Sequence, residues 1–243
     1  MLLTNEPAIV VQRPWNLVPI SAVNDPVAAI PAALLRLEPH PYASVGAPYG
    51  ALGSPYRLRD AVNARLLLAE QMLQQLEPGW RLAIFDAWRP LPVQAFMIEH
   101  AVRQECLQQQ VDPERPSAAL EQIRQSVGRF WAPPNPDPAA PPPHSTGAAV
   151  DLTLATLAGQ PLDLGSAIDA IGAVSEPDHF LELAATHPEA RQWHRRRSLL
   201  RQVMEAQGFA QHPNEWWHFS YGDQLWAWRT GAPQALYGRW SDG

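Results

Sequence analysis

The chain has 243 residues, of which 46% are hydrophobic and 17% are charged, and its formal net charge is -6 at pH 7. These values are typical of a globular protein with a sizeable core, and they exclude extensive disorder despite 26 prolines. The negative charge provides no basic field for nucleic acid, and we interpret the basic run at 194–197 as the solvent-exposed face of a helix.

Cys106 is the only cysteine, which excludes an intrachain disulfide and a zinc site built from thiolates. Residues 1–20 lack a basic leader followed by a continuous apolar run, and no other stretch approaches the length of a membrane span. We therefore expect a cytoplasmic protein without a membrane partner. The length favours a single domain over residues 1–243, and the sequence leaves the oligomeric state open.

The first predicted elements follow an irregular N-terminal segment, residues 1–56, which is rich in turn-forming residues. Apolar residues three to five positions apart predict a helix from Leu58 to Leu76, which a Pro-Gly pair ends. Alternating apolar residues predict a strand within 80–89 that Pro90 breaks, and helical spacing resumes over 93–110.

The next segment is proline-rich. Residues 132–143, APPNPDPAAPPP, can form neither a helix nor a strand ladder, because proline lacks an amide hydrogen and fixes φ. We interpret them as a stiff loop within one domain, and an interdomain linker is the alternative. A helix is then predicted over 190–207, and two strands, 215–222 and 224–230, are predicted to form a hairpin.

Three residues in two segments indicate metal chemistry. A strand predicted from Ala148 to Leu154 holds Asp151 on a rigid element, seven positions after His144. Each residue taken alone is more typical of a loop or turn. His218 adds a second imidazole, and a His, Asp, His set suits zinc with a fourth position open to water. Glu215 then remains to take a proton from that water and pass it to the leaving amine.

Two strings carry a resemblance to a known family. Residues 144–154, HSTGAAVDLTL, and 214–222, NEWWHFSYG, together resemble the D-alanyl-D-alanine dipeptidases of the VanX type, within the zinc D,D-peptidases. The resemblance implies an α+β fold in which a small antiparallel sheet is flanked by helices and irregular proline-rich loops. It also implies one zinc ion per chain and hydrolysis of D-alanyl-D-alanine or a closely related dipeptide, hence a role in cell-wall metabolism.

The same resemblance extends to further residues, from about Tyr42 onwards. It implies that Arg89, in FDAWRP, stabilises the anionic tetrahedral intermediate, where a surface salt bridge is the alternative. It implies that Asp169, in LDLGSAID, holds the substrate ammonium, where a helix N-cap is the alternative. Tyr56 is expected to line the pocket. Pro142 stands where many relatives have a serine that contacts substrate, which leaves the dipeptide preference open.

Two other functions remain open from the sequence. The first is a D,D-carboxypeptidase or peptidoglycan peptidase with the same zinc site and a longer groove, and the absence of an export signal argues against it. The second is a zinc-stabilised binding module without catalysis, and the presence of Glu215 and Arg89 argues against it. The physiological metal, and a role in antibiotic resistance as opposed to dipeptide recycling, are left undecided.

Overall fold

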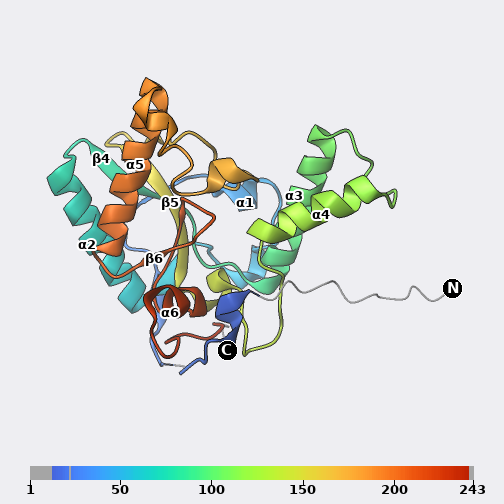
Figure 1. Ribbon diagram of the computed structural model, residues 1–243. Coiled ribbons are helices and arrows are strands. Elements are labelled where there is room, and N and C mark those ends of the chain that lie inside the picture. Colours follow the sequence, from blue (N-terminus) through green and yellow to red (C-terminus); the bar gives the residue numbers. More distant parts are fainter. Residues whose placement is uncertain (1–12, 22, 241–243) are drawn as a thin grey trace.

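The computed structural model describes residues 13–21 and 23–240, and within them a five-stranded sheet organises the molecule (Figure 1). The strand order is β2–β4–β5–β7–β6. The strands are β2 (Leu35–Arg36), β4 (Trp80–Asp86), β5 (Ala149–Thr156), β7 (His218–Ser220) and β6 (Ala210–Gln211). Neighbouring strands are antiparallel except β2, which runs parallel to β4 at the edge. A separate antiparallel pair consists of β1 (Val27–Ala29) and β3 (Arg57–Arg59).

Helices flank this sheet, which confirms the predicted α+β class. They are α1 (Pro41–Ser44), α2 (Asp60–Leu76), α3 (Leu91–Gln108), α4 (Ala118–Phe130), α5 (Pro188–Glu205) and α6 (Gln224–Thr230). Figure 1 shows α2 and α5 side by side on one side of the sheet, whereas α3 and α4 form a pair that extends away on the other side. Within the described residues, no helix combines the length and the apolar character that crossing a membrane requires.

The main core lies between the sheet and the α2–α5 layer. Its side chains come from positions that the sequence pattern places on one face of each element. The fully buried residues include Val62, Leu66, Ala69 and Leu73 of α2, Leu82 and Ile84 of β4, and Val150, Leu152 and Leu154 of β5. Each large aliphatic side chain contributes about 1.5–3 kcal/mol by leaving water. Helix α2 begins at Asp60, two residues after the predicted start at Leu58, because residues 57–59 form strand β3 and pair with β1.

The C-terminal hairpin prediction is wrong, because residues 224–230 form helix α6. The Asp223 side chain accepts a hydrogen bond from the Trp226 amide at 2.8 Å and so caps the first turn. Gly231 ends the helix in the left-handed region at φ 73°. The alternation of Leu225 with Ala227 is compatible with a strand, but the capping aspartate selects the helix.

Helix α4 is a second difference, since the sequence analysis predicts no element there. The Ser117 hydroxyl accepts from the Leu120 amide at 3.1 Å as an N-cap. Leu120, Ile123 and Val127 follow at helical spacing and pack into a second core that α3 shares. This serine, followed by apolar residues at that spacing, is the sequence signal for the helix.

Candidate metal centre

Strand register brings the predicted ligands together. Asp151 of β5 lies directly opposite His218, the first residue of β7. His144 belongs to a 3-10 turn, Pro143–Thr146, that immediately precedes β5. Gly147 connects the turn to the strand at φ 71°, where an added Cβ would meet Val27 Cγ2 at 3.1 Å. A left-handed, tightly packed residue at this point explains the glycine in HSTG.

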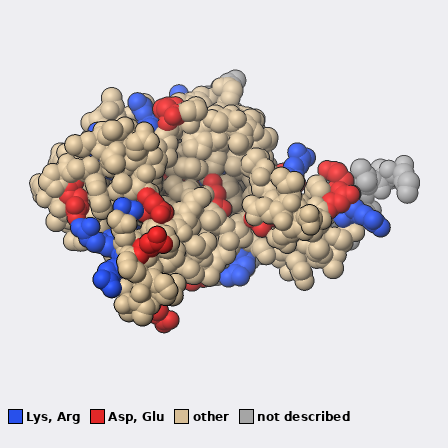
Figure 2. All heavy atoms as spheres, turned by 90° about the horizontal axis from the view of Figure 1, so that it is seen from above, with Lys and Arg blue, Asp and Glu red and all other residues tan. Residues whose placement is uncertain are grey.

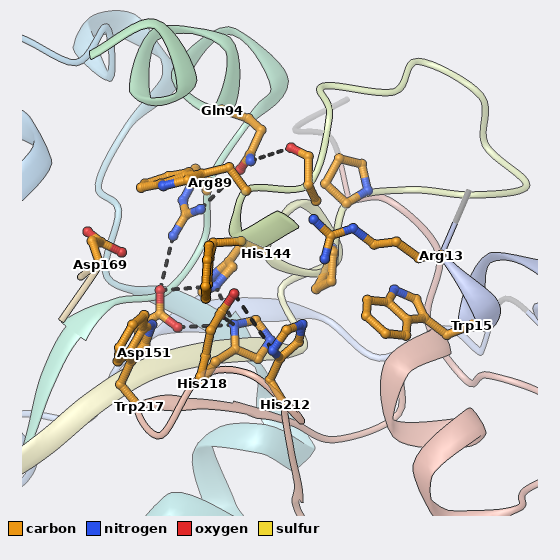
Figure 3. A pocket seen from close by; sticks show the side chains of 16 residues that line it. Arg13, Trp15, Arg89, Gln94, His144, Asp151, Asp169, His212, Trp217 and His218 are labelled. Atoms are coloured by element: carbon orange, nitrogen blue, oxygen red, sulfur yellow. Dashed lines mark hydrogen bonds and ion pairs between the residues drawn. The ribbon is translucent and has the colours of Figure 1, made fainter. Parts of the chain in front are cut away.

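The three side chains converge on one point (Figure 3). His144 Nε2 lies 3.2 Å from Asp151 Oδ2, and His218 Nδ1 lies 3.1 Å from Asp151 Oδ1. The two imidazole nitrogens are themselves 3.1 Å apart. A tetrahedral zinc ion with bonds of about 2.0–2.1 Å holds its donor atoms about 3.3 Å apart. The spacing of the cluster therefore matches that of a zinc ligand set.

Outer hydrogen bonds orient both imidazoles. His144 Nδ1 lies 2.7 Å from the Ala87 carbonyl oxygen, which can only accept, so Nδ1 carries a hydrogen, and in the neutral ring that a metal binds Nε2 carries the lone pair. His218 Nε2 lies 3.3 Å from Ser220 Oγ, which leaves Nδ1 facing the cluster. Both rings thus present the nitrogen that a metal needs.

Asp151 is ionised at the centre of the cluster. Burial opposes its ionisation, but in the metal-free protein the positive charges that His144 and His218 carry when protonated outweigh burial and hold the pKa of Asp151 well below its usual range. Only 2% of the residue is exposed. A buried carboxylate that stays charged is suited to a divalent cation.

Arg89 is fixed beside Asp151 and is buried, so it does not form the alternative surface salt bridge. Its Nε and one terminal nitrogen donate to Asp86 Oδ2 at 2.9 and 2.7 Å, and that terminal nitrogen also lies 3.1 Å from Asp151 Oδ2. The other terminal nitrogen donates to Gln94 Oε1 at 3.1 Å. Asp86 and Gln94, which the sequence analysis did not single out, therefore hold the guanidinium in one orientation.

Asp169 lies in the loop that follows β5, at φ 65°, and does not cap a helix. The Tyr42 hydroxyl donates to Asp169 Oδ2 at 2.8 Å and also accepts from Arg89 at 3.3 Å. Burial and the charge of Asp151 raise the pKa of Asp169 to about 7. Asp169 is thus linked through Tyr42 to the arginine beside the cluster.

Arg197 holds the loop that carries Asp169, which corrects the interpretation of 194–197 as a solvent-exposed face. Only 2% of Arg197 is exposed. Its guanidinium donates to the carbonyls of Leu164, Val174 and Glu176 at 2.8, 3.0 and 2.9 Å. A run of arginines cannot reveal this, because the carbonyls come from a distant, irregular part of the chain.

Glu215 lies next to the cluster without a hydrogen bond to it. Its Oε2 is 3.6 Å from His218 Nδ1, and 7% of the residue is exposed. Burial and the charge of Asp151 raise the pKa of Glu215 to about 8. His212, which the sequence analysis missed, lies on the other side, with Nδ1 3.7 Å from Glu215 Oε1. Its only signal is its place six residues before His218.

The His, Asp, His cluster and its neighbours line a narrow cavity of about 40 Å³. The lining includes Arg89, Asp169, His212, Glu215 and Pro142. Figure 2 shows the molecule hollowed between its larger part and the α3–α4 lobe, with acidic side chains inside the hollow. Tyr56 is not among the residues that line the cavity. Its hydroxyl donates to the Leu37 carbonyl, and its ring packs in the main core. Tyr42, and not Tyr56, contacts the predicted substrate aspartate.

Fold and site together define a class of protein. A buried His, Asp, His cluster that leaves room for water, with a glutamate and an arginine beside it, is the arrangement of a metal-dependent hydrolase. The M15 peptidase model, described as D-Ala-D-Ala dipeptidase, matches residues 36–234, and the chain belongs to this family.

Two curated dipeptidases are similar in sequence to this chain, and one solved structure aligns with it. A D-alanyl-D-alanine dipeptidase of Synechocystis sp. is 45% identical over 227 residues, which cover 89% of this chain and 90% of the relative. One of Escherichia coli is 30% identical over 161 residues, or 66% of this chain and 64% of the relative. A solved structure of a vancomycin-resistance D,D-pentapeptidase VanY mutant in complex with Zn(II) aligns with TM-score 0.41 and 13% identity, over 85% of this chain and 88% of that one.

Proposed function

We propose that the protein hydrolyses D-alanyl-D-alanine, or a closely related dipeptide, with one zinc ion bound per chain. The observation that carries this proposal is the convergence of His144, Asp151 and His218 in a member of the D-Ala-D-Ala dipeptidase family. Asp169, at one side of the same cavity, supplies a carboxylate for a free amine. The narrow cavity favours a small substrate.

The residues fit a zinc ion. Asp151 Oδ1 is buried and accepts no well-directed hydrogen bond from the described residues, although His218 Nδ1 lies 3.1 Å away. A metal would satisfy this oxygen together with the two imidazole lone pairs. Two nitrogens and one carboxylate are a set that zinc accepts in catalytic sites with an open fourth position. When bound, the metal would lower the pKa of water and polarise the peptide carbonyl.

Glu215 is proposed as the general base and then the general acid. Its carboxyl group lies beside the ligand His218, 3.6 Å away, and is shielded from bulk solvent. It can accept a proton from the attacking water and deliver it to the leaving amine. Groups that do both work best when their pKa lies near the working pH.

Arg89 is proposed to stabilise the oxyanion. Its guanidinium is held by Asp86 and Gln94 and lies 3.1 Å from Asp151 Oδ2, so it is directed at the cluster before any substrate arrives. A donor that is already oriented stabilises developing charge without reorganisation. Asp169 is proposed to bind the substrate ammonium, with Tyr42 orienting its carboxylate.

One observation favours a peptidase that accepts longer substrates. Asp169 and Trp131 also line a second cavity, of about 530 Å³, between α1, α3 and residues 167–171. A peptide extended beyond the amine could use this space if the Tyr42–Asp169 contact opened. The family membership favours the dipeptidase. Measuring turnover of substrates of different length distinguishes the dipeptidase from a peptidase that accepts longer substrates.

The test is a hydrolysis screen of the zinc-loaded protein. The substrates are D,D-, L,D- and L,L-dipeptides, N-acetyl-D-Ala-D-Ala and a pentapeptide that ends in D-Ala-D-Ala. We expect turnover of D-Ala-D-Ala and none of its acetylated form, because acetylation removes the charge that pairs with Asp169. Equal turnover of free and N-acetylated D-Ala-D-Ala, or a preference for the pentapeptide, would contradict the dipeptidase proposal and favour a carboxypeptidase.

The cellular setting is part of the proposal. A cytoplasmic location is supported by the single cysteine, since intracellular proteins do not depend on disulfides. A role in cell-wall metabolism follows from the proposed substrate. Cell fractionation with an antibody to the protein tests the location, and the D-Ala-D-Ala content of cells without the protein tests the role.

A further inference from the structure

Arg13 is a site residue that lies outside the part of the chain matched by the family model, residues 36–234. It immediately precedes a 3-10 turn, Pro14–Leu17, yet it lines the cavity of the His, Asp, His cluster. Only 8% of the residue is exposed. Figure 3 shows its guanidinium directed into the cavity, beyond His144 and above His212. The N-terminal segment therefore supplies a buried cation to the site.

This cation is incompletely satisfied. One terminal nitrogen donates to the Gly128 carbonyl at 3.2 Å, and the guanidinium carbon lies 5.5 Å from the centre of the Trp15 ring. Nε is buried without a hydrogen-bond partner, and Arg13 forms no ion pair with a described carboxylate, although the charge of Glu215 acts on it through space. Burying a guanidinium without an anion is costly unless a ligand supplies the anion.

Arg89 is placed for a different role, because Tyr42 links it to Asp169, on the side of the cluster opposite Arg13. It contacts both Asp86 and Asp151 within 3.1 Å. Arg13 and Arg89 are the cavity-lining arginines among the described residues, so Arg13 is the one available on the side opposite Asp169.

The placement of charges matches a free dipeptide. In Figure 3, Asp169 and Arg13 lie on opposite sides of the cluster formed by His144, Asp151 and His218. A dipeptide carries an ammonium at one end and a carboxylate at the other, with the scissile carbonyl between them. With the ammonium at Asp169 and the carbonyl at the cluster, the carboxylate would extend towards Arg13.

We propose that Arg13 binds the C-terminal carboxylate of the dipeptide and so restricts cleavage to peptides with one free residue after the scissile bond. This inference rests on the proposed dipeptidase function. The guanidinium fork suits a carboxylate because two parallel N–H groups match its two oxygens. Arg13 is thus a specificity-determining residue, and it does not take part in proton transfer.

The experiment compares Arg13→Gln, Arg13→Lys and the control Arg129→Gln, an exposed arginine next to Gly128. Steady-state kinetics are measured with D-Ala-D-Ala and with its C-terminal amide. For the acid substrate, Arg13→Gln should raise KM by roughly 10- to 100-fold with little change in kcat, as for loss of a charged hydrogen bond. The amide should be nearly unaffected, and Arg13→Lys, which keeps the charge but loses the two parallel N–H groups, should recover part of the affinity for the acid.

Four outcomes would overturn the inference. Unchanged kinetics in Arg13→Gln would remove Arg13 from substrate binding. An equal loss on the acid and the amide, or a loss confined to kcat, would mean that Arg13 acts on the fold or on Glu215. A failure of Arg13→Lys to differ from Arg13→Gln in a folded protein would exclude a charge-based role.

A separate readout distinguishes this inference from the proposed function. If the wild-type protein hydrolyses neither substrate, the proposed function fails. Calorimetric titration of D-Ala-D-Ala and its amide into the wild-type protein and Arg13→Gln then tests the carboxylate contact alone. We expect Arg13→Gln to weaken binding of the acid by the same roughly 10- to 100-fold factor and to leave the amide unchanged. Equal affinity of both proteins for the acid would contradict it.

Discussion

Replacing Asp169 with asparagine removes a charge and keeps an oxygen that can accept from the Tyr42 hydroxyl. In the folded, metal-free protein, burial and the charge of Asp151 raise the pKa of Asp169 from 3.8 to about 7. At neutral pH, ionisation of this group therefore lowers the free energy of unfolding of the wild-type protein, whereas asparagine cannot ionise. The change isolates one carboxyl group in a site that contains several.

The size of the effect follows from the pKa shift. The difference between a pKa of 3.8 and one of about 7, at 1.36 kcal/mol per pH unit, sets an upper limit of about 4 kcal/mol on the destabilisation, and because Asp169 is partly exposed we expect about 2–4 kcal/mol. The folded pKa is raised, so the stabilising contribution is present below about pH 4 and is lost as the pH rises to about 7. Across that window the unfolding free energy of Asp169→Asn should rise relative to that of the wild type.

The assay is urea unfolding of both metal-free proteins, followed by circular dichroism at several pH values between about 4 and 8. Asp60→Asn, at an exposed aspartate, is the matched control. The wild-type protein and the control should respond to pH in parallel, whereas Asp169→Asn should become relatively more stable towards neutral pH. A constant difference between Asp169→Asn and the wild type across the window would refute the reasoning.

Three other predictions concern the metal, the base and the loop. Alanine at any one of His144, Asp151 and His218 should lower the zinc content, measured by mass spectrometry after dialysis. One zinc ion per chain retained in all three variants would show that these residues are not the zinc ligands. Glu215→Gln should keep zinc and lose roughly 10²–10⁴-fold in turnover, and loss of zinc would make Glu215 a ligand. Arg197→Met should lower the free energy of unfolding, measured in urea, by about 3–5 kcal/mol, because three buried carbonyls lose their charged hydrogen-bond donor. Arg195→Met, at an exposed position, should cost far less, and equal losses would contradict the loop-anchoring role.

Local patterns determined the regular elements. Strand β5 was predicted from alternation, and helices α2 and α3 from apolar spacing, because a one-sided core imposes these periods on the chain. The same logic failed at 224–230, where alternating apolar residues indicated a strand. There a single capping side chain, Asp223, decided the outcome.

The candidate metal ligands could also be selected from the sequence. His144 and Asp151 flank the start of a strand, and His218 starts another, so each is held on a rigid element whatever the rest of the fold. The sequence could not show that β5 and β7 are neighbours, or that their register sets Asp151 against His218. Pairing between strands separated by more than sixty residues is a property of the whole sheet.

Tertiary structure alone decided which polar residues surround these candidate ligands. Tyr56 and Tyr42 are indistinguishable in a turn-rich segment, yet one packs in the core and the other contacts Asp169. Arg197 resembles its exposed neighbours and is buried against loop carbonyls. Arg13 reaches the cavity from the far N-terminal side. A buried charge is recognised only by its surroundings, and those come from segments distant in the sequence, which only the folded chain brings together.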